Sequence, residues 1–264
     1  MKNDSTREWD AVSYHRVSTP QTEWGKRVLS RLTLRGDERV IDAGCGTGRL
    51  TGELMAQLPR GRLIAIDRSW NMLLTARANL RPDYGTRICY ACVELPHLPF
   101  AEWADVVFST ATFHWVRDHD ALFTEIWRAL RPGGRLFAQC GGGPNLAEAH
   151  ALAEQVMHSP PFARYFAEWT GVWEFSSPEE AAARLQRAGF TEVTTSLEEA
   201  PVTLADESSY REFVTTVVYN QHLTRLPDDQ LRESFIDKVT ALARQHTAPF
   251  RLDYWRLNLK AQRT

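Results

Sequence analysis

The sequence predicts an α/β protein with a Rossmann-like, seven-stranded, mostly parallel sheet, helices on both faces and a helical cap. Three observations lead to this class. Short apolar runs alternate with helix-like stretches from residue 39 to residue 140. Three glycines, Gly44, Gly46 and Gly48, follow the first run, as in the strand–turn–helix unit that binds nucleotides. The second run ends in Asp67, at a place where open α/β sheets often hold a ribose.

The elements of the first half are predicted from the apolar runs and from the residues that interrupt them. Pro59 ends one helix, Ser69 is placed to cap the next, and Pro132 ends a third ahead of two glycines. One more helix is expected at 21–32, before the sheet begins. We expect strands at 39–43, 62–67, 87–93, 104–109 and 135–140, with helices at 47–58, from 69 onward and at 120–130.

The second half is predicted to add helices and two final strands to this core. Gly189 is the expected stop of a helix at 178–187. The aromatic residues of 162–175 either line an acceptor pocket or pack the cap. We expect 1–264 to form one domain, with an N-terminal lid and helix at 1–36, a cofactor-binding core at 37–140, helical cap insertions at 145–190 and 206–247, and final strands at 191–204 and 251–262.

The composition narrows the classes of partner. The chain has 264 residues, with 31 basic and 33 acidic side chains and a formal net charge of −2. This balance gives no bulk attraction to nucleic acid or to a membrane, so neither is expected as a partner. No apolar run reaches the ~18 residues of a membrane span, and the N-terminus lacks the apolar core of a secretion signal, so a cytoplasmic location is expected. Cys89 and Cys92 form a C-x-x-C pair without a second pair at metal-ligand spacing, so no metal is expected.

The spacing of the glycines favours a nucleoside without phosphates. A dinucleotide site reads G-x-G-x-x-G, whereas this sequence reads D-x-G-x-G-x-G, with Arg49 where the third dinucleotide glycine would fall. The carboxylate of Asp42 beside the turn suits a cationic ligand, and Asp67 can accept both hydroxyls of a ribose. S-adenosylmethionine has these properties, and a dehydrogenase-type Rossmann domain is the alternative.

Five motifs in order carry a resemblance to a known family. They are Ile41-Asp-Ala-Gly-Cys-Gly-Thr-Gly48, Ile66-Asp-Arg-Ser-Trp-Asn-Met-Leu73, Leu98-Pro-Phe100, Ala104-Asp-Val-Val-Phe-Ser109 and Leu130-Arg-Pro-Gly-Gly134. With them, residues 38–140 resemble the class I S-adenosylmethionine-dependent methyltransferases. The resemblance implies S-adenosylmethionine as the cofactor.

The resemblance also implies where this cofactor contacts the chain. Tyr14 and Gln21 lie in a region that often folds over the cofactor in the family, although the lead-in can equally pack on the sheet edge. Glu94 stands where the family usually has an Asp near the adenine amino group. Its longer side chain either accepts a hydrogen bond from that group or extends into solvent. The remaining contacts implied by the motifs are Arg68 and Met72 in the acidic loop, the backbone of Leu95 at the adenine, and Thr110 near the methionine part.

The segment after the fourth strand is the candidate for the chemistry. His114 and Trp115 lie beside the transferred methyl and the acceptor in one interpretation, and form a packed wall in the other. The protein mainly aligns the acceptor, because the cofactor carries the activated methyl. A carboxylate acceptor needs no strong base, whereas a hydroxyl acceptor usually needs one, and His114 is then the nearest candidate.

The acceptor class follows from a second, fainter resemblance. Phe113-His-Trp-Val116, with the helical additions late in the chain, is similar to the trans-aconitate and related carboxyl methyltransferases. O-methylation of a small organic acid is therefore expected, with Arg16, Arg164 and Arg251 either holding an acid group or lying plainly on the surface. The alternatives are N- or C-methylation of a natural-product intermediate and a cofactor-binding protein without transfer activity.

Overall fold

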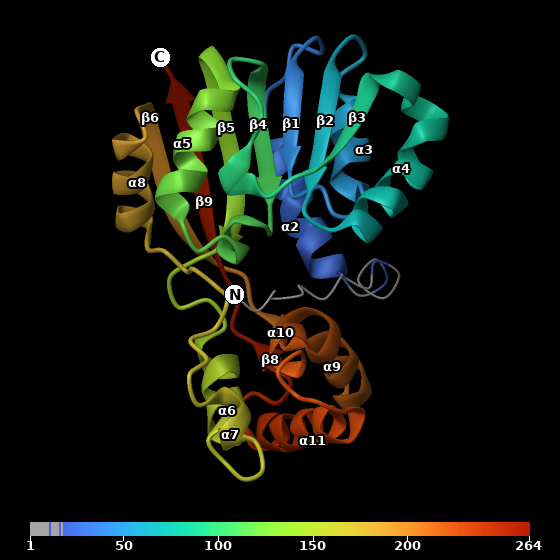
Figure 1. Cartoon of the computed structure of the whole chain (residues 1–264), viewed down its shortest axis with the longest axis vertical. Coiled ribbons are helices and arrows are strands. Elements are labelled where there is room, and N and C mark those ends of the chain that lie inside the picture. Colours follow the sequence, from blue (N-terminus) through green and yellow to red (C-terminus); the bar gives the residue numbers. More distant parts are fainter. Residues whose placement is uncertain (1–10, 12–15, 17) are drawn as a thin grey trace. The chain divides into compact units, whose positions relative to one another are not determined.

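The computed structural model describes residues 11, 16 and 18–264, and it divides the chain into two compact units (Figure 1). The first, called here the sheet unit, comprises Thr19–Gly143, Trp173–Glu198 and Arg256–Thr264. The second, the helical unit, comprises the described residues up to Ser18 with Pro144–Val172 and Glu199–Trp255. Each unit is described by itself.

The sheet unit is built on seven strands in the order β3-β2-β1-β4-β5-β9-β6 (Figure 1). The first five of these pair in parallel, and β9 is antiparallel to β5. The predicted Rossmann-like, mostly parallel sheet is therefore confirmed. The strands are β1 (Arg39–Ala43), β2 (Arg62–Asp67), β3 (Ile88–Cys92), β4 (Ala104–Thr110), β5 (Leu130–Gly141), β6 (Phe190–Glu199) and β9 (Trp255–Arg263).

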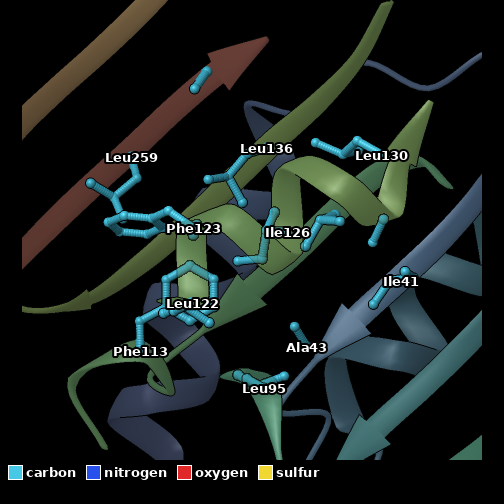
Figure 2. Close-up of a cluster of buried hydrophobic side chains, with 14 of the residues drawn as sticks. Ile41, Ala43, Leu95, Phe113, Leu122, Phe123, Ile126, Leu130, Leu136 and Leu259 are labelled. Atoms are coloured by element: carbon cyan, nitrogen blue, oxygen red, sulfur yellow. The ribbon is translucent and has the colours of Figure 1, made fainter. Parts of the chain in front are cut away.

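Helices cover both faces of this sheet because the strands are apolar on both sides. Val40 of β1 packs in a core with α2 (Thr19–Ser30), α3 (Arg49–Ala56) and α4 (Trp70–Tyr84). Its neighbour Ile41 points the other way, into a core with α5 (His119–Ala129) and α8 (Pro178–Arg187). Figure 2 shows α5 laying Phe123 and Ile126 against the sheet, close to Leu259 of β9.

Side-chain caps set the helix ends as the sequence indicates. The Ser69 hydroxyl accepts the Met72 backbone N–H at 3.3 Å and starts α4. At α8, Ser177 and Glu180 exchange hydrogen bonds with each other's backbone N–H groups in a capping box. Gly189 follows the end of α8 with φ +98°, a conformation that favours glycine, so both the predicted cap and the predicted stop are confirmed.

The helical unit has its own core of aromatic side chains. Phe162, Phe166, Tyr219 and Phe235 are all buried there, and their rings lie 5.5–6.2 Å apart in the contacting pairs Phe162–Phe235, Phe166–Phe235 and Tyr219–Phe235. The unit consists of α6 (Ala147–Met157), α7 (Ala163–Phe166), α9 (Glu207–Phe213), a π-helical turn at Val214–Val218, α10 (Asn220–Leu223), α11 (Asp229–Gln245) and a small sheet of β7 (Val202–Thr203) with β8 (Arg251–Leu252).

The boundaries differ from the predictions in the second half. Helix α8 lies in the sheet unit, although 145–190 was expected as cap, because its apolar face packs against α5. The stretches 191–204 and 251–262 each divide into two strands in different sheets. In the first, Pro201 lacks the N–H that a continuous ladder needs. In the second, the Asp253 side chain leaves the ladder and accepts backbone N–H groups at the start of α6.

Candidate functional site

Two of the three glycines after β1 are required by packing. Gly44 and Gly48 both have φ +84°. A Cβ on Gly44 would lie 2.1 Å from Oγ1 of Thr112, and a Cβ on Gly48 would lie 2.8 Å from Cδ1 of Leu80. These glycines therefore let the loop after β4 approach the turn and let α3 approach α4. They shape the site without facing open space.

Gly46 is different, because it does face open space. Its φ is +53°, and a Cβ there would meet no heavy atom within 4 Å. Its N–H donates to Oδ2 of Asp67 over 3.0 Å, and the Ser69 N–H donates to Oδ1 over 2.9 Å. A carboxylate offers about four lone-pair sites, so it can accept hydrogen bonds from several donors at once. The structure thus places an open backbone beside a fixed, half-buried carboxylate at the end of β2.

Asp42 lies buried beneath the turn. Its Oδ2 accepts a hydrogen bond from the Thr51 hydroxyl at 2.6 Å. Burial raises the pKa of Asp42 to about 7; the Thr51 hydrogen bond opposes this rise and the charge of Asp67 adds to it. A nearby positive charge would favour the ionised form of Asp42.

The end of β3 lies beside the end of β2, where Cys92 pairs with Asp67. The Val93 N–H donates to the carbonyl of Asp67 at 3.2 Å, which brings the following turn beside β2. In that turn Leu95 is buried and Glu94 is exposed. Arg68 is exposed as well. The backbone of Val93, two residues before Leu95, therefore contacts Asp67, whereas the side chains of Arg68 and Glu94 reach solvent.

Gln21 offers an unsatisfied atom near the turn. Its Oε1 is buried, and no described residue donates a hydrogen bond to it. The contact of Arg49 Nη1 with Thr22 Oγ1 at 3.4 Å ties α2 to the start of α3, next to the glycines. A buried acceptor without a donor is costly, so a ligand donor would satisfy it. Tyr14, the other lid candidate, lies outside the described residues, and the predicted Met72 is buried in the first turn of α4.

The loop after β4 presents His114 in a defined tautomer. Nδ1 of His114 accepts the Gly141 backbone N–H at 3.2 Å, so in the neutral ring the proton is on Nε2. No described residue accepts from that Nε2–H. Burial, followed by the charges of Arg256 and His119, holds the pKa of His114 well below its usual range. The ring is therefore a neutral hydrogen-bond donor in this arrangement, and a base role would require the bond to Gly141 to break.

This loop begins at Thr110, the last residue of β4. The carbonyl of Thr110 accepts the Thr112 hydroxyl at 2.9 Å, so the predicted residue fixes the loop through its backbone. Its side chain is half-buried at the carboxyl edge of the sheet. Ligands of open α/β sheets bind at that edge, which keeps Thr110 a candidate contact.

The aromatic cluster predicted at 162–175 divides between the two units. Phe166 and Trp169 pack in the helical unit, with ring centroids 5.6 Å apart. Trp173 and Phe175 lie in the sheet unit, beside Trp115 and His114 respectively, at 5.8 and 5.9 Å. Sequence reasoning offered no signal for this division, because it depends on which unit each part of the segment joins.

The three arginines predicted to hold an acid group each contact a neighbour in the helical unit. One further arginine, Arg256 on β9, was not predicted. It is buried, and its guanidinium lies 4.7 Å from the Trp24 ring centroid. In the sheet it pairs with Gly141 of β5. A charge at an inward strand position was the only available signal for it. The contacts of the predicted arginines are Arg16 with Glu212, Arg164 with Tyr165 and Arg251 with Glu148.

Two other properties of the described residues bear on function. They contain no group of three or more His, Cys, Asp or Glu side chains arranged to hold a metal. Within the same part of the chain, no helix has the length and apolarity to cross a bilayer.

Comparison with known proteins supports the assignment of the core. The family model for the methyltransferase domain matches residues 41–138. Trans-aconitate 2-methyltransferase of Methylobacterium nodulans is 31% identical over 186 residues, which cover 70% of this chain and 65% of that protein. The enzyme of the same name from Acidovorax ebreus is 32% identical over 142 residues, covering 50% of this chain and 49% of that protein. The chain thus spans about half to two thirds of the length of these relatives.

A solved structure extends the likeness to most of the chain. Phosphoethanolamine N-methyltransferase 2 of Haemonchus contortus, solved with S-adenosyl-L-methionine, superimposes with a TM-score of 0.61. The match covers 96% of this chain and 56% of that chain, at 18% sequence identity. At this identity the match establishes the fold alone.

Proposed function

Residues 41–138 belong to the methyltransferase domain family within a class I fold, and from this premise we propose that the chain transfers a methyl group from S-adenosylmethionine to a small organic acid. One observation carries the cofactor assignment: the open backbone of Gly46 beside the fixed carboxylate of Asp67. A carboxylate at the end of the second strand can accept hydrogen bonds from both hydroxyls of a ribose, and a ligand without phosphates matches the spacing of the glycines.

The other predicted cofactor residues take roles that fit their surroundings. Gln21 would accept a hydrogen bond from the cofactor at its unsatisfied Oε1. The ionised form of Asp42 would attract the positive charge from beneath the turn. Leu95 would meet the adenine through its backbone N–H, with Glu94 outside it, and Thr110 would meet the methionine part. Arg68 and Met72 flank this site in the proposal, and the placement of Tyr14 remains a prediction.

When bound, S-adenosylmethionine supplies a methyl group activated by a sulfonium. Transfer to a carboxylate oxygen forms a C–O bond while the C–S bonding pair stays on sulfur, so no proton has to be removed. The chain's task is then to align the acceptor and to exclude water. We propose that His114 serves this alignment by donating its Nε2–H to the acceptor carboxylate. A neutral, donating imidazole suits an acid acceptor better than a hydroxyl acceptor, which would need a base.

The similarity to trans-aconitate 2-methyltransferases supports an acid as the acceptor class, because their name gives a carboxylic acid as the acceptor. We further propose a small-molecule acceptor rather than nucleic acid, because the formal net charge is −2, and a cytoplasmic location. The organisation of 1–264 as one methyltransferase domain with a helical cap is part of the same proposal.

The proposal is tested first by calorimetric titration with S-adenosylmethionine, S-adenosylhomocysteine and the nicotinamide dinucleotides. Binding of the first two alone supports the cofactor assignment, and binding of a dinucleotide alone contradicts it. Incubation with S-adenosylmethionine and trans-aconitate, followed by mass spectrometry, then tests the acceptor. A product that gains one methyl and loses it on alkaline hydrolysis is an ester. A methylated product that resists hydrolysis, formed from an amine or carbon acceptor, would favour N- or C-methylation instead.

A further inference from the structure

Residues 173–176 form a short segment, called here the strap, that is fixed to the carboxyl edge of the sheet. The Glu174 N–H donates to the carbonyl of His114 over 2.9 Å. The carbonyl of Ser176 accepts the Gly143 N–H over 2.9 Å. These two backbone bonds hold the strap against the loop after β4 and against the glycines after β5. Ligands of open α/β sheets bind at this edge.

Alternate residues of the strap build an aromatic surface. The rings of Trp173 and Phe175 are nearly parallel, at 10°, with centroids 6.4 Å apart. Trp173 lies 5.8 Å from Trp115, and Phe175 lies 5.9 Å from His114. All four side chains are half-buried. We call His114, Trp115, Trp173 and Phe175 the aromatic wall.

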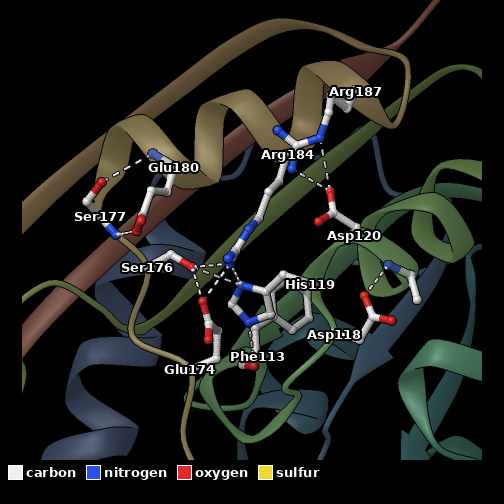
Figure 3. Close-up of polar contacts among 11 residues, drawn as sticks. Phe113, Asp118, His119, Asp120, Glu174, Ser176, Ser177, Glu180, Arg184 and Arg187 are labelled. Atoms are coloured by element: carbon white, nitrogen blue, oxygen red, sulfur yellow. Dashed lines mark hydrogen bonds and ion pairs between the residues drawn. The ribbon is translucent and has the colours of Figure 1, made fainter.

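The intervening residues of the strap are held by one guanidinium. Arg184 reaches from α8 and donates through Nη1 to Oε1 of Glu174 and to Oγ of Ser176, both at 2.7 Å (Figure 3). The same Nη1 lies 3.3 Å from Nδ1 of His119. The Nε2–H of His119 donates in turn to the carbonyl of Phe113 at 3.0 Å. Arg184 thereby joins the strap to the loop that carries His114 and Trp115.

We propose that the aromatic wall binds the acceptor and that Arg184 is the positioning residue that holds the wall together. This inference rests on the proposed methyl transfer. Aromatic faces stack on flat, conjugated systems, and the Nε2–H of His114 adds a hydrogen-bond donor to the wall. The acceptor it fits is a carboxylic acid whose carboxylate is attached to a planar, unsaturated carbon framework. A saturated, flexible acid of the same charge fills this surface less well.

The nearby charge distribution agrees with this class. Glu174 is the acidic side chain of the strap, and the Arg184 guanidinium holds its pKa below the usual range, against the effect of burial. The carboxylate of Glu174 is thus paired with a guanidinium of α8. An anionic acceptor at the wall meets rings and a donor rather than an uncompensated negative charge.

The test is calorimetric titration of the protein loaded with S-adenosylhomocysteine. The probes are trans-aconitate and its saturated counterpart, which carries the same carboxylates on a flexible chain. We expect trans-aconitate to bind the wild type about tenfold more tightly than the saturated acid. In Trp173→Leu and Phe175→Leu this preference should disappear, while S-adenosylhomocysteine affinity stays within about twofold.

The positioning role is tested with Arg184→Met and Arg184→Lys. We expect Arg184→Met to raise KM for trans-aconitate about tenfold with a smaller change in kcat, and the lysine variant to recover part of the loss. Arg187→Met is the matched control, because Arg187 is on the same helix and pairs with Asp120 instead of the strap. Circular dichroism and thermal unfolding check that each variant is folded.

The outcomes separate this inference from the proposed function. Failure of the wild type to bind S-adenosylhomocysteine would overturn the proposed function. If the wild type binds S-adenosylhomocysteine but shows no preference for the unsaturated acid, the aromatic wall does not bind the acceptor as proposed. The same conclusion follows if the preference persists in both leucine variants. Equal kinetic effects of Arg184→Met and Arg187→Met would overturn the positioning role.

Discussion

The backbone N–H of Gly46 donates to Oδ2 of Asp67 over 3.0 Å, so the turn after β1 and the acid at the end of β2 are joined by one hydrogen bond. The bond fixes the orientation of a carboxylate that remains half-buried. Gly46 is also the glycine of the motif at which an added Cβ would meet no heavy atom within 4 Å. The proposed cofactor site depends on this pair.

Replacement of Asp67 by Ala should weaken S-adenosylmethionine binding by on the order of 2 kcal/mol or more, because the ribose loses its acceptors. Calorimetry on the variant and on wild type gives the value. Asp83→Ala is the matched control, since Asp83 is an exposed acid near the far end of α4 and its removal should leave affinity unchanged. An Asp67→Ala protein with wild-type affinity would contradict the cofactor pose.

Alanine substitutions at Gly46 and Gly48 should have different effects on cofactor affinity and on thermal stability. Gly46→Ala adds a methyl where nothing else lies within 4 Å, so it should lose cofactor affinity with a stability cost of about 1–2 kcal/mol from its positive φ. Gly48→Ala carries the same backbone cost and adds a clash with Leu80, so it should unfold at a lower temperature. Thermal unfolding and calorimetry on both variants measure the difference. The prediction fails if Gly46→Ala keeps full affinity.

Asp42 should make the stability depend on pH. Its folded pKa, about 7, exceeds the ordinary value of 3.8, so the folded state binds more protons than the unfolded state between these values. The contribution of Asp42 to the free energy of unfolding is therefore most favourable below about pH 4, and it declines as the pH rises to about 7. Asp42→Asn removes this decline. Relative to wild type, its free energy of unfolding should therefore rise by as much as a few kcal/mol between pH 4 and pH 8. Urea unfolding of both proteins at several pH values tests this, and a constant difference would contradict it.

His114 should act as a donor and not as a base. The low pKa of the ring predicts that kcat in wild type, measured at saturating S-adenosylmethionine, shows no titration of His114 from pH 6 to pH 8. His114→Gln can present an N–H near the position of Nε2, so it should keep kcat/KM within about tenfold, whereas His114→Ala should lose about 10–100-fold. If His114 instead acted as a base, His114→Gln should lose as much activity as His114→Ala, because an amide cannot take up the proton. Initial rates with trans-aconitate across this pH range distinguish the two.

The sequence was most informative where structure is local. The ranges predicted for β1 and β2, 39–43 and 62–67, match the observed strands because each is an apolar run between clear breaks. The helix expected from residue 47 begins at Arg49, since Gly48 takes a left-handed conformation that a helix does not admit. The D-x-G-x-G-x-G pattern identified the turn, and the three glycines proved to serve different purposes within it.

Tertiary contacts account for what the sequence did not provide. Trp169 and Trp173 are four residues apart, yet they join different units, because each packs with rings from distant parts of the chain. The arginines predicted to hold an acid group contact neighbours in the helical unit, while Arg256 is buried on β9. No local pattern reports such partners, since they depend on residues brought together by the fold.

The helical unit should lose stability in acid, because it contains two buried histidines, His150 and His222. His222 is 1% exposed, and burial holds its pKa well below the usual range; burial lowers the pKa of His150 to about 4. Because both folded pKa values lie below the ordinary 6.5, the unfolded state binds more protons, and stability is lost as pH falls from about 6.5 through 4. His222→Phe keeps a ring between Trp169 and Tyr219 and removes one of these protons, so its stability should fall less steeply. Hydrogen exchange of α6 and α11 in both proteins at pH 7 and pH 5 measures the two slopes, and equal slopes would show that His222 does not titrate on unfolding.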